Sequence, residues 1–203
     1  MRNIKFLIIL LTCLLLACNN ATKSVSEDKV ARTTQNSDIS ANSIYLSREE
    51  WTNQDGQQMP LDDLSGKVQV IAMIFTSCGY ACPQLVENMR AIELALPAEI
   101  LNQVHFTLVS FDTQSDSAAT LKLYASQKHL DKNWTLLHGS QDQVRMLSML
   151  LEVKYSKLAL GGFNHTNQIA ILNQKGEIVK KIQGLDVHTK EGLEAIEAIT
   201  LKK

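Results

Sequence analysis

The chain has 203 residues, which is enough for one domain with a full hydrophobic core. Its 20 basic and 21 acidic side chains almost cancel. Because the sequence contains no basic patch, nucleic acid is not an expected partner.

The N-terminus predicts export from the cytoplasm. Two basic residues precede an uncharged apolar stretch at 6–17, which is shorter than the roughly 20 residues that a membrane span needs. Such a pattern is typical of a secretory signal. The stretch ends in Leu15-Leu16-Ala17-Cys18, which resembles a bacterial lipobox. We therefore expect a lipoprotein signal peptide over residues 1–17.

Lipid on Cys18 would anchor the protein to a bacterial membrane on the periplasmic side, and Asn19 fits sorting to the outer membrane. Signal cleavage removes two basic residues and no acidic ones, which leaves a net charge of −3. It also removes Cys13, so only Cys78 and Cys82 remain as free cysteines. An oxidising compartment permits a disulfide between them. A bridge across so short a loop constrains the unfolded chain little, which argues against an inert structural staple.

Residues 18–44 are rich in small polar side chains and have few large apolar ones. Such a segment buries too little surface to offset the entropy of ordering. We expect a lipidated N-terminus and flexible tether over 18–44, followed by one folded domain over 45–203.

Strand and helix patterns alternate along this domain. Continuous or alternating apolar residues predict strands, and apolar residues at helical spacing predict helices. The expected strands cover 68–75, 105–111, 134–137, 168–173 and 177–183. The expected helices cover 83–96, 115–129, 141–151 and 189–199. This order predicts an α/β, thioredoxin-like fold with a central mixed sheet flanked by helices.

Several residues of these elements have predicted local roles. Pro83 suits the first position of a helix. Asp112 and Asp116 are interpreted as a turn residue after a strand and a helix cap, with Ser115 as the other candidate cap. Met149 lies in an apolar helix, where core packing explains it.

Cys78 and Cys82 follow the first of these strands, in the run Thr76-Ser77-Cys78-Gly79-Tyr80-Ala81-Cys82-Pro83. Residues i and i+4 share one face of a helix, so the two sulfur atoms can converge. The start of a helix favours thiolate over thiol. Thiolates attack disulfides and also bind soft metal ions, and the sequence leaves both chemistries open.

Three observations bear on this choice. The spacing is C-x-x-x-C, whereas thioredoxin-type redox pairs are C-x-x-C. None of the three prolines, Pro60, Pro83 and Pro97, lies near Gln168, where a thioredoxin would carry its cis-proline. His165 occupies that place instead. Two thiolates and an imidazole suit copper or zinc, although a lone histidine near a strand end is usually a surface or hydrogen-bonded residue.

The chain resembles the SCO/SenC family, the copper-binding thioredoxin-like proteins of cytochrome c oxidase assembly, from about Gln58 to its last helix. Four segments carry the resemblance: GKVQVIAMIFTSCGYACPQL from Gly66, LVSFD from Leu108 with Asp116 after it, WTLLHG from Trp134, and FNHT from Phe163. The cysteine pair together with the histidine is the specific part.

The resemblance implies that Cys78, Cys82 and His165 bind one copper ion. It implies a metallochaperone whose partner is the copper subunit of cytochrome c oxidase or another exported copper acceptor. The family often has an aspartate between the cysteines and one before the histidine, where this chain has Tyr80 and Asn164. Fewer carboxylates disfavour the harder cation, so we hypothesise a site that favours Cu(I), with Cu(II) possible.

A thiol-disulfide oxidoreductase is the main alternative, in which Cys78 attacks a partner disulfide and Cys82 resolves the mixed disulfide. Peroxide reduction is disfavoured, because the sequence places no activating arginine beside Cys78. The sequence therefore favours a chaperone over an enzyme.

Overall fold

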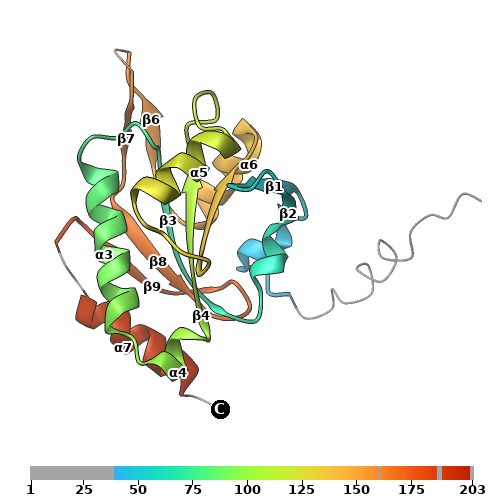
Figure 1. Ribbon diagram of the computed structural model, residues 1–203. Coiled ribbons are helices and arrows are strands. Elements are labelled where there is room, and N and C mark those ends of the chain that lie inside the picture. The colour runs from blue at the N-terminus through green and yellow to red at the C-terminus, as the bar shows by residue number, and fades with distance from the viewer. Residues whose placement is uncertain (1–38, 160, 187–188, 202–203) are drawn as a thin grey trace, which may run out of the picture. The chain divides into compact units, whose positions relative to one another are not determined.

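The computed structural model describes residues 39–159, 161–186 and 189–201 (Figure 1). The predicted signal peptide, the lipidation site Cys18 and most of the predicted tether lie outside the described residues. Ser43 and Ile44, which end the predicted tether, are buried. Within the described part of the chain, no helix has the length and apolar character to cross a membrane.

A mixed sheet is the centre of the described region. Its seven strands follow the order β2-β1-β5-β4-β3-β8-β9 within the described residues. Strand β3 is parallel to β4, and β4 is parallel to β5, whereas β8, β9, β1 and β2 join in antiparallel pairs. The bounds are β1 Glu50–Asn53, β2 Gln58–Pro60, β3 Val68–Ile74, β4 Val104–Ser110, β5 Trp134–His138, β8 Gln168–Leu172 and β9 Ile178–Gln183. This sheet confirms the predicted fold class.

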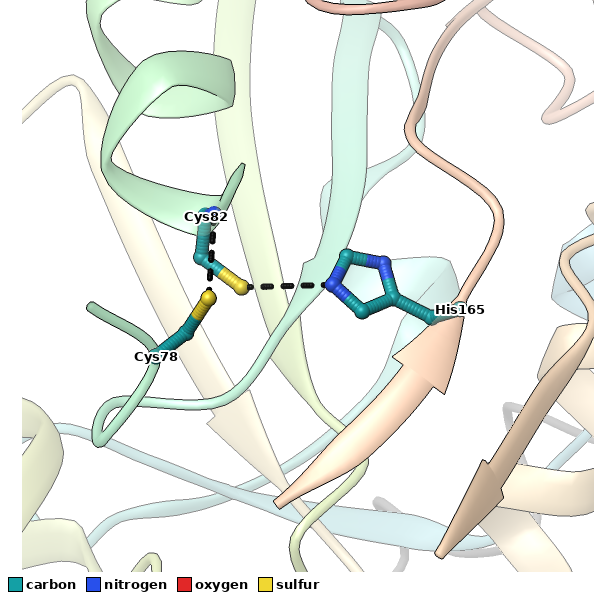
Figure 2. A group of neighbouring side chains, drawn as sticks. All are labelled: Cys78, Cys82 and His165. Carbon is teal, nitrogen blue, oxygen red and sulfur yellow. Dashed lines mark hydrogen bonds between the residues drawn. The ribbon is translucent and has the colours of Figure 1, made fainter. Parts of the chain in front are cut away.

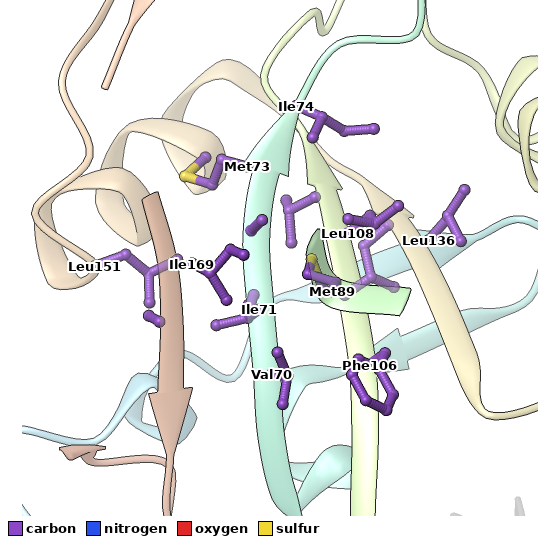
Figure 3. Packing of buried hydrophobic residues seen from close by; sticks show 14 of the residues in the cluster. Val70, Ile71, Met73, Ile74, Met89, Phe106, Leu108, Leu136, Leu151 and Ile169 are labelled. Carbon is purple, nitrogen blue, oxygen red and sulfur yellow. The ribbon is translucent and has the colours of Figure 1, made fainter. Parts of the chain in front are cut away.

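The apolar strands are central because both of their faces are covered. Every residue of β3 is buried, and Val68 to Ile74 pair in parallel register with Val104 to Ser110. Successive side chains of a strand point to opposite faces. Figure 3 shows this for Met73 and Ile74, which project from β3 in opposite directions into the core.

Helices flank the sheet. Their bounds are α3 Ala81–Ala95, α4 Ala98–Leu101, α5 Ala118–Gln127, α6 Gln141–Leu150 and α7 Thr189–Thr200, with 3-10 helices at Ile44–Leu46 and Leu61–Leu64. Helix α3 packs against α7, which crosses the lower end of α3 in Figure 1. Arg90 of α3 donates to the carbonyl of Lys128 at the end of α5. Helix α3 begins at Ala81, shortly after β3 ends at Ile74, and the Cys78 N–H donates to the Phe75 carbonyl, so the start of α3 lies beside the end of β3.

Two short antiparallel pairs were not predicted. One is β1–β2. The other is a separate ladder of β6, Tyr155–Lys157, and β7, Phe163–His165, which is not part of the main sheet. Gly161 and Gly162 turn the chain between them with φ of +93° and +76°, a region that side chains with a Cβ disfavour. Strand β7 ends on His165.

Details at two helix starts differ from expectation. Ser117, and neither Ser115 nor Asp116, caps α5, and its hydroxyl accepts from the Thr120 N–H. Helix α3 begins at Ala81, so Pro83 occupies its third position instead of its first. Proline is tolerated there because N–H groups of the first turn have no partner within the helix.

Candidate metal centre

Cys78, Cys82 and His165 meet at the end of β3, as Figure 2 shows. Their sulfur and nitrogen atoms all lie within 4.8 Å of one another, and Cys82 Sγ is 3.7 Å from His165 Nε2. Bonds of about 2.3 Å to sulfur and about 2.0 Å to nitrogen, known for zinc, would separate two ligands by about 3.8 Å at a trigonal angle. Cys82 and His165 are therefore already spaced as two ligands of one ion, and all three ligand atoms are close enough to converge on it.

The loop before α3 places Cys78 at the start of the helix. The Cys78 N–H donates to the Phe75 carbonyl, and the Cys82 N–H donates to Cys78 Sγ at 3.3 Å. Partial burial pushes the pKa of the Cys78 thiol upward. Hydrogen bonds from the backbone N–H groups of Cys82, Tyr80 and Ala81 outweigh that effect, so the net pKa is lowered. The prediction of a stabilised thiolate is confirmed for Cys78.

The same prediction is wrong for Cys82. Its side chain is fully buried. Burial, together with the neighbouring Cys78 sulfur, raises the pKa of the Cys82 thiol. The two cysteines are thus unequal: Cys78 is partly exposed and its thiol has a lowered pKa, whereas Cys82 is covered and keeps its proton unless a metal ion displaces it.

His165 presents one nitrogen to the cysteines. Its Nδ1 lies 3.3 Å from the carbonyl oxygen of Thr166, which can only accept, so Nδ1 carries the proton and Nε2 offers its lone pair towards Cys82. Burial lowers the pKa of His165, and the bond to Thr166 offsets this only in part. The imidazole is therefore held neutral, which is the form that binds metal.

An aromatic cluster holds the His165 ring. We use this name for Phe75, Phe111, Tyr155 and Phe163. The ring centroid of Phe111 is 5.1 Å from that of His165, and the Phe75 ring meets it edge-on at 6.1 Å. Phe111 also stacks on Tyr155 at 5.3 Å. This cluster was not predicted from the sequence, where its only signal is a phenylalanine directly after each of two central strands.

Asp116 fixes the start of the cysteine loop. This buried carboxylate accepts from the Thr76 N–H at 2.9 Å, and from the hydroxyls of Thr76 and Ser110. It ties the end of β3 to the end of β4, so the interpretation of Asp116 as a helix cap is wrong. Asp112 accepts from the N–H groups of Gln114 and Ser115, which confirms it as a turn residue.

Three other histidines are placed apart from the cluster. His105 is mostly buried in β4 and bonds through Nε2 to the Thr135 hydroxyl at 2.8 Å. His138 ends β5, and His129 follows α5 with a positive φ of 53°. None of them belongs to the group of metal-ligating side chains found among the described residues. His188 lies outside the described residues.

The sequence model of the SCO1/SenC family matches residues 40–201. The chain belongs to the SCO1/SenC family. This confirms the family predicted from the cysteine and histidine segments.

Relatives support the same assignment. The chain is 28% identical over 138 residues to the SCO1 protein homolog of Bacillus subtilis, an alignment that covers 66% of this chain and 71% of the relative. A SCO1/SenC family lipoprotein from Bacillus anthracis has a similar structure, with 28% identity, a TM-score of 0.67 and coverage of 74% and 92%. Bradyrhizobium japonicum ScoI with copper bound shares the fold at 22% identity, a TM-score of 0.61 and coverage of 75% and 98%.

Proposed function

We propose that this protein is a membrane-tethered copper chaperone. One copper ion is held by Cys78, Cys82 and His165, with Cu(I) preferred. The observation that carries the proposal is the convergence of three soft or borderline ligand atoms within 4.8 Å, in a member of the SCO1/SenC family. A known relative by fold, the Bradyrhizobium ScoI, has been solved with copper bound.

The preference for Cu(I) follows from the donor set. Two sulfur atoms and one nitrogen atom suit a soft ion of low coordination number. Within the described residues, no carboxylate joins the cluster. The nearby Asp116 is already occupied by three hydrogen bonds. Copper is cargo here, delivered to the copper subunit of cytochrome c oxidase or to another exported acceptor.

Export and anchoring complete the proposal. The N-terminal pattern favours cleavage before Cys18 and lipid on that residue. The Bacillus anthracis relative is itself described as a lipoprotein. Labelling with radioactive palmitate should mark the native chain and not a Cys18→Ser variant. A label that survives this substitution would contradict lipidation at Cys18.

Anaerobic Cu(I) titration tests the metal site. The titration uses a chain with Cys13→Ser and Cys18→Ser, called the background chain, in which Cys78 and Cys82 are the two remaining cysteines. Against a competing Cu(I) chelator, binding should saturate at one ion per chain. Cys78→Ser should abolish it and His165→Ala should weaken it about tenfold or more, because one ligand bond is lost.

His138→Ala is the matched control, since it removes a half-buried histidine that lies outside the cluster. It should leave the Cu(I) affinity unchanged. Equal affinities for His165→Ala and His138→Ala would contradict the assignment of His165. No saturable binding in the background chain would contradict the chaperone itself.

A thiol-disulfide oxidoreductase is the second candidate, favoured by the inequality of the cysteines. The partly exposed Cys78, whose pKa is lowered, suits attack on a partner disulfide, and the covered Cys82 suits release of the mixed disulfide. The partner leaves as a dithiol, and the protein keeps the disulfide. In this reading Cys82→Ser traps a mixed disulfide, and His165→Ala leaves disulfide turnover unchanged.

A further inference from the structure

A groove of about 530 Å³ opens beside the aromatic cluster. Helix α6, the turn after β4 and strand β6 form its walls. Its volume lies within the roughly 300–1,000 Å³ of ligand-binding sites. None of the three proposed copper ligands lines it. The groove is therefore a separate feature that the copper site does not use.

The floor of the groove is apolar. Phe111, Val153, Tyr155 and Phe163 all line it. Met149 of α6 stands at its edge and is 66% exposed, so the expectation that it packs in the core is wrong. Methionine adapts its shape to varied apolar partners. The floor therefore suits aliphatic or aromatic side chains of a bound segment.

The rim of the groove is basic. Arg145, Lys154 and Lys157 line it, and Asp112 is the one carboxylate among the described lining residues. That carboxylate is buried and bonded to two backbone N–H groups. Among the described residues, neither Arg145 nor Lys154 forms an ion pair. A groove with this charge attracts carboxylates, although the whole chain has a net charge of −1.

One wall is an open strand edge. The Lys154 carbonyl accepts from the Thr166 N–H at 2.8 Å, and the Leu158 N–H donates to Gly162 at 3.0 Å. Because such bonds alternate along an antiparallel strand, the N–H and C=O groups of Tyr155 and Lys157 point away from β7. Within the described residues, no other backbone group bonds to them. All of β6 lines the groove.

We propose that this groove binds an extended, acidic segment of the copper acceptor, which adds to β6 as a further strand. Backbone hydrogen bonds to an open strand edge give affinity, and side-chain pockets give specificity. The acidic side chains would meet Arg145 and Lys154, and the apolar ones would meet the floor.

The position of the groove ties this segment to the copper site. Tyr155 lies directly opposite His165 in the β6–β7 register. The Phe111 ring faces both the groove and the His165 ring. A bound segment is thus one side chain away from a copper ligand. The inference rests on the proposed function only for the identity of the partner, because segment binding itself needs no copper.

The probe is a fluorescein-labelled hexapeptide, Glu-Val-Glu-Phe-Glu-Val, with blocked ends. Fluorescence anisotropy with the purified full chain in mild detergent, without copper, should show saturable binding. The counterpart with lysine in place of glutamate should bind at least tenfold more weakly. A peptide with N-methyl groups at alternate positions should also lose binding, because it cannot pair with β6.

The test variant is the double charge reversal Arg145→Glu and Lys154→Glu, which should weaken peptide binding tenfold or more. The matched control is Lys67→Glu with Lys175→Glu, two exposed lysines beyond the opposite end of β3. It should bind like the unchanged chain. Equal affinities for the two double variants, or no effect of N-methylation, would overturn the proposal.

The Cu(I) titration on the same preparations separates the two hypotheses. Binding of one Cu(I) without peptide binding would contradict the proposed peptide groove and leave the proposed copper site intact. Peptide binding without Cu(I) binding would leave a peptide groove but refute its role in copper transfer.

Discussion

The cysteine side and the histidine side of the cluster have very different support. Cys82 is fully buried in the first turn of α3, against the central sheet. His165 is half-buried at the end of a ladder of two three-residue strands outside that sheet. A two-stranded ladder is marginal by itself. Cys82 is therefore held by the core, whereas His165 depends on ring contacts and on its bond to the Thr166 carbonyl.

Removal of an aromatic ring beside His165 should cause the largest loss of stability. Phe111→Ala leaves a cavity between Phe75, Tyr155 and Phe163, and we expect a loss of about 4 kcal/mol in unfolding free energy. Urea denaturation followed by circular dichroism measures it. Phe111→Leu keeps most of the volume and should cost about 1 kcal/mol. Similar losses for both variants would show that cavity formation is not the cause.

The next largest effect should come from the cysteine side. Asp116→Ala leaves three donors without their acceptor, and we expect a loss of about 3 kcal/mol. Ser110→Ala removes a single bond and should cost about 1 kcal/mol. The rate of Cys78 alkylation should change in Asp116→Ala, since the loop start is freed. An unchanged rate would mean that the loop does not depend on this carboxylate.

Acid should weaken the central sheet through His105. Burial, assisted by Lys67, lowers the pKa of His105 to about 4. The unfolded chain, with a pKa near ~6.5, binds the proton first. Stability is thus full above about pH 6.5 and falls as the pH drops towards 4, by about 2 kcal/mol from this residue. His105→Gln should flatten the pH dependence of the urea midpoint between 4 and 6.5, and an unchanged slope would refute this origin.

The smallest effect should be confined to the histidine side. Thr166→Val removes the hydroxyl that accepts from the Lys154 N–H at 3.2 Å but keeps the bond from its own N–H. We expect a loss of about 1 kcal/mol in local stability. Hydrogen exchange should quicken at the β6–β7 ladder, with the rate of Cys78 alkylation unchanged. A parallel change in that rate would show that the two sides are coupled.

The fold was largely predictable because its central strands are continuous apolar runs. Every residue of β3 is buried, so the strand needs layers on both faces of its sheet, as an α/β fold provides. Strands β6 and β1 carry mixed, short sequences whose extended form depends on tertiary contacts. The Tyr155-Ser156-Lys157 sequence of β6 has no strand pattern of its own.

The three proposed metal ligands, Cys78, Cys82 and His165, were predicted from their spacing and from the family resemblance. The role of Asp116 was not, because it depends on a contact with Thr76, 40 residues earlier in the chain. The unequal pKa values of the cysteines were missed for a similar reason. Burial of Cys82 is set by the helices and strands around it, which a local motif does not reveal.

Unequal burial of the two sulfur atoms also determines which cysteine a partner reaches first. A thiol that approaches from solvent reaches the partly exposed Cys78 before it can reach the covered Cys82. In the proposed copper transfer, ligand exchange would then begin at Cys78, and Cys82 would release the ion after Cys78. A chain trapped midway through the proposed transfer should still bind copper through Cys82 after its bond to Cys78 has been exchanged for one to the partner.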